Sequence, residues 1–230
     1  MDCRREPCST DESRALMPSE GSTNDYERKD EPVKLTTNTQ ISVDGVAQAN
    51  GGRNEEFDPG MERGGWARPL FDSEAMAFVN DFYQRADAFL FGRRTYQLFA
   101  GYWGIQLGNP IADALNSRPK YVASNTLTDP QWADTTVLSG DVGAAIRELK
   151  AKPGGEIQVH GSGNLVRWLL ENELVGEINL LVCPVIVGQG ARLFPDTGRD
   201  TALELLESRT YPKGITLQVY RPAGRPEYAT

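Results

Sequence analysis

The amino-acid sequence predicts an α/β domain with a central mixed, mostly parallel β-sheet, helices on both faces, and an antiparallel strand pair at the C-terminal end. Two observations predict this fold class. Strand-length apolar runs alternate with helical patterns through most of the chain, which is typical of parallel strands joined by helices. The last two apolar runs follow each other directly, and each is bounded by proline or glycine, as in an antiparallel pair. The 230 residues suffice for one sizeable core.

The expected strands are apolar runs of differing length. The first alternates loosely between apolar and polar residues, the next ones are short, and EINLLVCPVIV is the longest apolar run of the chain. Strands are predicted at 33–43, 87–91, 120–124, 135–138, 156–160, 177–187, 203–211 and 215–220.

The expected helices follow the apolar spacing of a 3.6-residue turn. Asp72 precedes the first of them and Asp141 the fourth, and aspartate is among the best N-capping residues. Helices are predicted at 73–86, 94–99, 111–116, 142–150 and 165–171. The glycine-rich segment 50–69 has no pattern of its own, and loops of this length are usually binding loops or lids.

The two ends of the chain differ in composition from the middle. Residues 1–32 are rich in Ser, Asp, Glu, Arg and Pro and have few apolar residues, which predicts a disordered leader. The ordered domain is therefore expected over 33–222, with a flexible tail at 223–230. The first residues lack the apolar middle of a secretory signal, and no apolar run approaches the roughly 20 residues of a membrane span. We therefore expect a cytoplasmic protein with no membrane partner.

Charge and residue counts exclude several classes of function. The formal net charge is −8, with 32 acidic and 24 basic residues, which argues against a nucleic-acid partner because phosphate neutralisation needs a concentrated basic surface. The single histidine, His160, and the three cysteines, Cys3, Cys8 and Cys183, do not have the spacings of a zinc site or a disulfide framework. We therefore expect no metal and a small-molecule substrate.

Three strand ends carry groups that suit a phosphate. In VHGSGNLVRWLL (159–170) a strand breaks at glycines and opens directly into a helix, whose first amides attract an anion. DAFLFGRRTY (87–96) and YVASNTL (121–127) place arginines and hydroxyl groups just past two other strands. Because the carboxyl ends of parallel strands share one edge, the three motifs together predict a site for one extended anionic ligand, such as a dinucleotide. Taken singly, the first motif is explained equally well by a plain strand-to-helix turn, and the other two are explained better by solvated charge and by turn residues.

Six segments carry a resemblance to a known family. They are ISVDGVAQ (41–48), GGW (64–66), LFGRRTY (90–96), YVASNTL, VHGSGNLVRWLL and LLVCPVIVGQGARLF (180–194). In their order along the chain they resemble the dihydrofolate-reductase-like proteins related to the reductase domain of the bifunctional riboflavin-biosynthesis deaminase-reductase. The resemblance covers about 33–222. It implies a three-layer α/β/α fold, NADPH as hydride donor and often a homodimer, with the 177–187 strand as a candidate contributor to the interface.

The resemblance also implies roles for individual residues. Arg93 and Thr95 match an element that grips the cofactor phosphates, and Arg93 or Arg94 would supply the charge that favours NADPH over NADH. Ser124 and Asn125 match the segment beside the adenosine ribose and its 2′-phosphate. The loop 160–164 matches the turn against the pyrophosphate and nicotinamide half, and its cofactor-binding candidates are Gly161, Ser162, Gly163 and Asn164.

Candidates for contact with the substrate come from several loops. Asp44, in the Ser-x-Asp-Gly element after the first strand, is a catalytic and substrate-binding candidate that could hydrogen-bond the substrate, although Asp before Gly is also a common turn pair. His160 titrates near neutrality and is a candidate proton donor, with a histidine hydrogen-bonded to nearby backbone as the alternative. Trp66 and Phe71 are candidates to stack on a planar substrate, but Trp66 could equally anchor its loop. Asp72 is expected to act as the helix cap rather than as an acid.

Two departures from the riboflavin-pathway reductases shape the functional prediction. Those enzymes usually carry a glutamate where this chain has His160 and an aspartate where it has Gly176. The predicted function is therefore NADPH-dependent hydride transfer to a small planar heterocycle, pterin- or pyrimidine-like, rather than to the pathway's own intermediate. A side-chain proton donor is optional, because hydride transfer is the chemistry of the cofactor. The alternative is a non-catalytic nucleotide-binding or sensor protein on the same fold.

Overall fold

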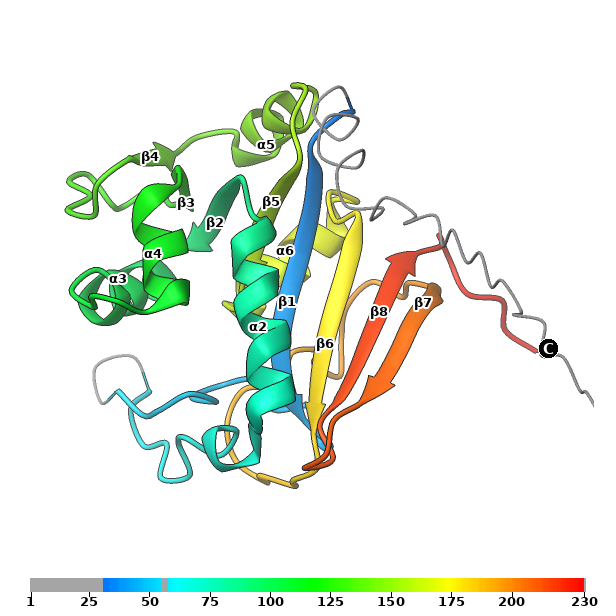
Figure 1. Ribbon diagram of the computed structural model, residues 1–230. Coiled ribbons are helices and arrows are strands. Elements are labelled where there is room, and N and C mark those ends of the chain that lie inside the picture. The colour runs from blue at the N-terminus through cyan, green and yellow to red at the C-terminus, as the bar shows by residue number, and fades with distance from the viewer. Residues whose placement is uncertain (1–30, 55–57, 230) are drawn as a thin grey trace, which may run out of the picture.

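The computed structural model describes residues 31–54 and 58–229, so nearly all of the expected disordered leader lies outside the described residues. Within these ranges eight strands form one sheet in the order β4-β3-β2-β5-β1-β6-β8-β7 (Figure 1). The strands are β1 (Lys34–Ser42), β2 (Ala88–Gly92), β3 (Lys120–Ala123), β4 (Thr135–Leu138), β5 (Glu156–His160), β6 (Glu177–Cys183), β7 (Leu203–Thr210) and β8 (Thr216–Pro222).

Strand direction follows the sequence prediction. The neighbouring strands from β4 through β6 all run parallel, while β8 is antiparallel to β6 and β7 is antiparallel to β8. The mixed, mostly parallel sheet with a C-terminal antiparallel pair is thereby confirmed. Since parallel strands end on the same side, the carboxyl ends of β1 to β6 lie along one edge of the sheet, where open α/β sheets bind their ligands.

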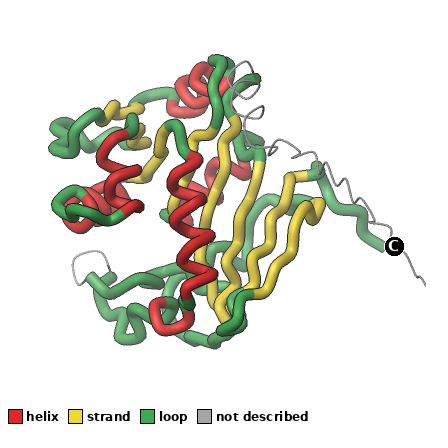
Figure 2. Tube along the Cα trace, viewed as in Figure 1, coloured by secondary structure: helices red, strands yellow, loops and turns green. Residues whose placement is uncertain are grey.

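Helices cover both faces of the sheet (Figure 2). They are α2 (Ser73–Arg85), α3 (Arg93–Trp103), α4 (Pro110–Ser117), α5 (Val142–Lys150) and α6 (Gly163–Glu171), preceded by a short 3₁₀ helix, η1 (Arg68–Leu70). A first core contains buried residues of α2, α3 and α4, and a second core contains those of α5 and α6. These two cores confirm the three layers. No helix in the described ranges is long and apolar enough to span a membrane.

The predicted caps are present at two helix starts. The Oδ1 atom of Asp72 accepts a hydrogen bond from the amide of Ala75 at 2.9 Å, and that of Asp141 accepts one from Ala144 at 2.9 Å. Helix α3 exceeds its prediction most, because it continues through Gly101 to Trp103 instead of ending at residue 99. Helices α4 and α6 are each two residues longer than predicted. Glycine inside a helix costs only about 1 kcal/mol, so packing on the first core overrides it.

Strand β6 differs from its prediction in length and in exposure. It ends at Cys183, because Pro184 follows and has no amide hydrogen to continue the ladder. It also lies between β1 and β8, with Ile178, Leu181 and Cys183 almost fully buried. Both edges of β6 are therefore paired, so β6 has no free edge on which a strand of another copy could pair. The contribution of 177–187 to an interface between copies stays a prediction.

The C-terminal segment is held more firmly than a flexible tail would be. Ala202 exchanges backbone hydrogen bonds with the segment at 223–224 in both directions, which extends the β7–β8 pair beyond Pro222. Asp200 then pairs with Arg225 at 2.8 Å and accepts a hydrogen bond from the hydroxyl of Tyr228 at 2.9 Å. The ordered part of the chain thus extends past the predicted boundary.

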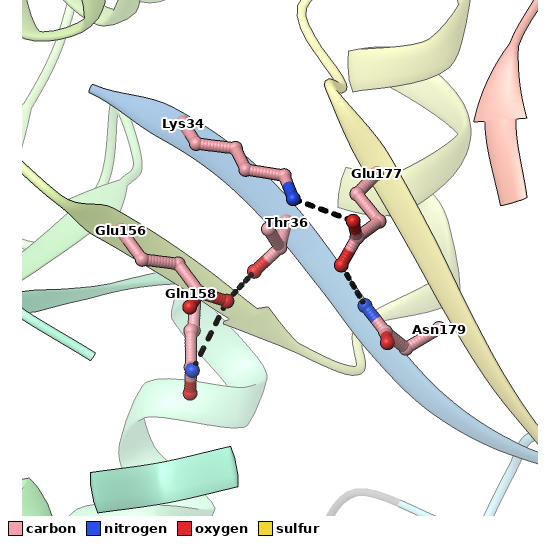
Figure 3. Close-up of polar contacts among 6 residues, drawn as sticks. All are labelled: Lys34, Thr36, Glu156, Gln158, Glu177 and Asn179. Atoms are coloured by element: carbon pink, nitrogen blue, oxygen red, sulfur yellow. Dashed lines mark hydrogen bonds and ion pairs between the residues drawn. The ribbon is translucent and has the colours of Figure 1, made fainter. Parts of the chain in front are cut away.

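The first residues of the central strand β1, at the amino ends of the parallel strands, take part in a network of polar contacts. Figure 3 shows β1 between two glutamates, one on each neighbouring strand. The buried hydroxyl of Thr36 donates to Glu156 at 2.6 Å, and Lys34 pairs with Glu177. Gln158 and Asn179 donate to the same two carboxylates at 3.2 Å. This network lies at the opposite end of the strands from their carboxyl ends, so we assign it a structural role.

Candidate functional site

A groove lies at the carboxyl edge of the sheet, between the ends of β2 and β3 and the starts of α3, α5 and α6. Its volume is about 560 Å³. The lining residues are Gly92, Arg93, Arg94, Ala123, Ser124, Asn125, Gly140, Asp141, Val142, Gly143, Ser162, Asn164, Leu165 and Trp168. The structure therefore brings the three phosphate-compatible motifs of the sequence together. A smaller hollow of about 240 Å³ beside Glu173 and Arg199 contains none of them.

Two helix starts meet in this groove. Gly92 is the N-cap of α3, and a Cβ atom placed on it would lie 2.9 Å from Oγ and 3.3 Å from Cβ of Ser162, the N-cap of α6. Glycine therefore lets the two starts approach each other. Neither start has a side-chain cap or an acidic residue in its first turn. Unpaired amide hydrogens and the positive ends of two helix dipoles are thereby concentrated in one place, as in known anion sites.

The turn that leads into α6 has an unusual backbone conformation. Gly161 has φ 68° and Ser162 has φ 55°, so both are left-handed. For a residue with a side chain this conformation costs on the order of 1 kcal/mol or more, and such strain is frequent at ligand sites. The turn brings β5 directly into α6 and leaves Ser162 and Asn164 on the groove wall. Gly161, Gly163 and Thr95 adjoin the groove in sequence without lining it.

The arginines at the start of α3 lack partners. Arg93 and Arg94 are the first two residues of the helix and are exposed. Their side chains form no hydrogen bond or ion pair with another residue of the described part of the chain. A positive charge at a helix N-terminus is unfavourable, because it meets the positive end of the dipole. A bound anion would offset this repulsion and would satisfy both guanidinium groups.

At the other end of the groove the polar side chains shape the loops. Ser124 accepts hydrogen bonds from the amides of Thr126 and Leu127 at 3.1 and 3.0 Å. Asn125 accepts one from Gly140 at 2.9 Å and so joins the β3 end to the loop before α5. Ser124 and Asn125 are thus turn residues, as the alternative interpretation holds, and they also line the groove.

Sequence reasoning missed one wall of the groove, the segment from Gly140 to Gly143. Its signal was present, since VLSGDVG repeats the pattern of a strand end, a glycine and a helix start. Asp141 was recognised only as a cap, a role that its bond to Ala144 confirms.

Asp44 acts as an anchor between two loops. Its carboxylate accepts hydrogen bonds from the hydroxyl of Ser42 at 2.6 Å and from the amides of Val187 and Gly188 at 3.0 and 2.8 Å. These bonds, led by that of Ser42, lower its pKa to about 2. Asp44 is therefore ionised at neutral pH, cannot donate a proton there, and ties the end of β1 to the loop after β6.

His160 lies in the core rather than in the groove. Its ring is 5% exposed, stacks on Tyr83 with centroids 4.0 Å apart, and contacts Phe82 and Phe89 at 5.7 Å. Nε2 is 3.0 Å from Oε1 of Gln158, so its hydrogen-bond partner is a side chain and not the backbone. Burial lowers the pKa of His160 to about 3. This position contradicts the hypothesis of a proton donor, because near neutrality the ring lacks the acidic second proton of an imidazolium and it does not line the groove.

The aromatic substrate-binding candidates serve the scaffold. The indole of Trp66 donates to the carbonyl of Gln48 at 3.0 Å, and its ring packs against buried residues including Met61. Phe71 packs, partly buried, against the first core. Neither ring lines the groove. The anchoring alternative for Trp66 agrees with these contacts, and the structure does not bring either ring to the candidate site.

Three comparisons place these observations among known proteins. The family model of the RibD C-terminal domain matches residues 33–217. The uncharacterized protein YyaP of Bacillus subtilis (strain 168) is 25% identical over 191 residues, which are 81% of this chain and 94% of YyaP. A protein of Shewanella sp. PV-4 provisionally assigned to riboflavin biosynthesis is 21% identical with a TM-score of 0.60, covering 83% of this chain and 99% of that one.

A pyrimidine reductase-like protein from Corynebacterium diphtheriae is 16% identical with a TM-score of 0.58, covering 84% of this chain and 93% of its own. At these identities the similarity to the two structures shows the fold alone. Together they confirm the dihydrofolate-reductase-like fold that the resemblance implied.

Proposed function

The chain belongs to the RibD C-terminal domain family, and from that premise we propose that it is an NADPH-dependent reductase. It transfers a hydride to a small, planar, heterocyclic acceptor of the pyrimidine or pterin kind. One observation carries the proposal: the uncapped starts of α3 and α6 lie side by side in the groove, next to two unpaired arginines. That arrangement suits a ligand with several phosphate groups.

Different residues in and beside the groove would hold different parts of the cofactor. The starts of α3 and α6, with Thr95 and Ser162, would hold the pyrophosphate through amides and hydroxyls. Arg93 and Arg94 would meet the 2′-phosphate, and Ser124 and Asn125 would lie beside the adenosine ribose. The remaining polar candidates of the α6 turn, Gly161, Gly163 and Asn164, would lie towards the nicotinamide half.

The proposed reaction needs positioning more than acid catalysis. A bound nicotinamide would supply the hydride, and the protein would orient it against the acceptor. Asp44 is ionised and His160 is buried and neutral, so neither is proposed as a proton donor. The acceptor would take its proton from water, and Asp44 would contribute by fixing the loop after β6 beside the end of β1.

The alternative function is a nucleotide-binding protein without turnover. One observation favours it: both catalytic candidates of the sequence, Asp44 and His160, belong to the scaffold. It shares the groove with the reductase, so binding alone does not separate the two.

Titration of the full chain with NADPH and with NADH, followed by nicotinamide fluorescence, tests the site. We expect saturable binding, tighter for NADPH, and the absence of saturation with either would contradict both functions. Oxidation of NADPH is then followed over a panel of pyrimidines, pterins, flavins and quinones. One acceptor with saturable turnover supports the reductase, whereas tight binding without oxidation across the panel supports the alternative.

A further inference from the structure

We propose that Trp168 is the platform on which the adenine base of the cofactor stacks, in an apolar corner of the groove bounded by α5 and α6. The proposal rests on the proposed cofactor site and adds to it, because the phosphates and the adenosine ribose have candidate residues there and the base has none. It follows from the place of Trp168 on the groove wall and from the partners that its ring lacks.

Trp168 differs from the other tryptophans of the chain in its contacts. The indole N–H groups of Trp66 and Trp132 donate hydrogen bonds at 3.0 and 2.7 Å. The ring of Trp103 is in contact with two other aromatic rings. Trp168 has neither an aromatic partner nor a hydrogen-bond acceptor for its indole N–H among the described residues. Its ring therefore remains available to a ligand.

The surroundings of Trp168 are apolar on the side of the groove. Trp168 lines the groove, and its side chain also packs, partly buried, against the second core. Leu165 lines the same wall one turn earlier, because residues three apart share a face of a helix. Val142, at the start of α5, is a further apolar lining residue. Trp168 is the only aromatic residue among the described residues that line the groove, so it is the one flat platform there.

The order of the groove residues matches the order of chemical groups in the cofactor. The helix starts would hold the phosphates, and Ser124 and Asn125 would lie beside the adenosine ribose. Asn125 accepts a hydrogen bond from Gly140 at 2.9 Å, and Val142 follows two residues later. At about 1.5 Å per residue, Trp168 lies about 7.5 Å along α6 from the first residue of that helix. The base, which is attached to the ribose, would therefore reach the wall formed by Val142 and Trp168.

A planar base binds more tightly when it stacks on an aromatic ring. Removal of the aromatic platform of one base weakens binding by about 5- to 100-fold. The apolar faces of the base would also leave water when they pack beside Leu165 and Val142. If Trp168 served the second core alone, its replacement would change the stability of the protein and leave ligand affinity unchanged.

The test uses the full chain and 2′,5′-ADP, which carries the adenine, its ribose and two phosphates but no nicotinamide. Trp168→Phe and Trp168→Ala are compared with Trp103→Phe, a control at a tryptophan that does not line the groove. Affinity is measured by calorimetry, the change in tryptophan emission is recorded on ligand binding, and circular dichroism confirms that each variant is folded.

We expect 2′,5′-ADP to quench the tryptophan emission of the wild type and of the control, because a stacked base quenches an indole. Trp168→Phe should keep the affinity within about 3-fold and lose most of this quenching, since phenylalanine still offers a flat ring. Trp168→Ala should bind 2′,5′-ADP about 10-fold or more weakly. The phenylalanine variant keeps the test informative if the alanine variant does not fold.

Two results would overturn the proposal and leave the proposed reductase function standing. The first is NADPH binding by the wild type together with undiminished quenching by 2′,5′-ADP in Trp168→Phe. The second is a folded Trp168→Ala variant that binds 2′,5′-ADP as tightly as the wild type, which would show that Trp168 serves only the core. A wild-type chain that binds neither NADPH nor 2′,5′-ADP would instead contradict the proposed cofactor site, and the adenine platform with it.

Discussion

The pH dependence of stability provides a sharp test of the position of His160. This chain has one histidine, so a single imidazole accounts for any histidine titration. In the folded protein burial holds its pKa at about 3, while in the unfolded chain an exposed histidine titrates near 6.5. Below about pH 6.5 the unfolded chain therefore binds a proton that the folded protein does not. The free energy of unfolding must then decrease as the pH falls from about 6.5 towards 3.

The size of the effect follows from the two pKa values. A pH of 5 is about 1.5 units below the pKa of the imidazole in the unfolded chain. Each of these units changes the free energy of unfolding by about 1.4 kcal/mol. Lowering the pH from 7 to 5 should therefore remove ~2 kcal/mol of stability. Carboxylates add little in this window, because most of them titrate at lower pH. A loss of this size is a sizeable part of the roughly 5–15 kcal/mol that stabilises a typical domain.

The assay is urea unfolding followed by tryptophan fluorescence at pH 7, 6 and 5, for the wild type and for His160→Gln. Glutamine keeps a polar head towards Gln158 and has no titrating group. The variant loses the ring that packs on Tyr83, so it should be less stable at every pH. Its stability should nevertheless change little between pH 7 and 5, and the difference between the two slopes isolates His160.

Equal slopes for the two proteins would refute the reasoning. A folded-state imidazole NMR signal that titrates near pH 6.5 would refute it independently. Either result would place His160 in contact with solvent and restore it as a candidate proton donor.

Further predictions concern the groove and its supports. Arg93→Ala should weaken NADPH binding by about 10-fold and NADH binding much less, as measured by fluorescence titration, because a charge-assisted bond to the 2′-phosphate is lost. Equal losses of affinity for the two cofactors would show that Arg93 does not bind the 2′-phosphate. Lys152→Ala serves as the control, since Lys152 is an exposed cation. Gly101→Ala should raise the free energy of unfolding by about 0.5–1 kcal/mol, because it lies inside α3 with no atom within 4 Å of the new Cβ. Gly161→Ala, at φ +68°, should instead lower the free energy of unfolding by about 1–2 kcal/mol and weaken NADPH binding. If thermal unfolding showed the same change in stability for both alanine variants, the left-handed turn would not be required. Asp44→Asn should speed protease cleavage in the loop after β6, since two amides there lose their carboxylate acceptor; unchanged cleavage, read by mass spectrometry, would show that the loop is held by other contacts.

Local sequence patterns predicted the helices and strands of this fold well, because residues near one another in the sequence largely determine where such an element forms. The 142–150 helix and the 135–138 and 156–160 strands match their predictions at both ends. Errors of two kinds appear. α3 continues through Gly101 because its aromatic residues pack on the first core, which is a contact between distant residues. β6 ends before Pro184, a local signal that the predicted range passed over.

The candidate site was predictable in part for the same reason. Parallel strands share a carboxyl edge, so the motifs at Arg93, Ser124 and Ser162 had to come near one another once the sheet was parallel. The close approach of Gly92 to Ser162 was not predictable, since it depends on how two helices pack. Nor were the roles of Asp44 and His160, whose types suit catalysis and structure equally.

The sequence by itself determined the order and kind of the elements, the parallel sheet, and the set of phosphate-compatible groups at its strand ends, because periodicity, caps and glycines act over a few residues. Only the tertiary structure decided which titratable groups remain accessible and which strand is left at the edge. Burial and hydrogen bonding are set by chain segments far apart in sequence, and they make His160 neutral, keep Asp44 ionised, pair both edges of β6 and leave β7 exposed.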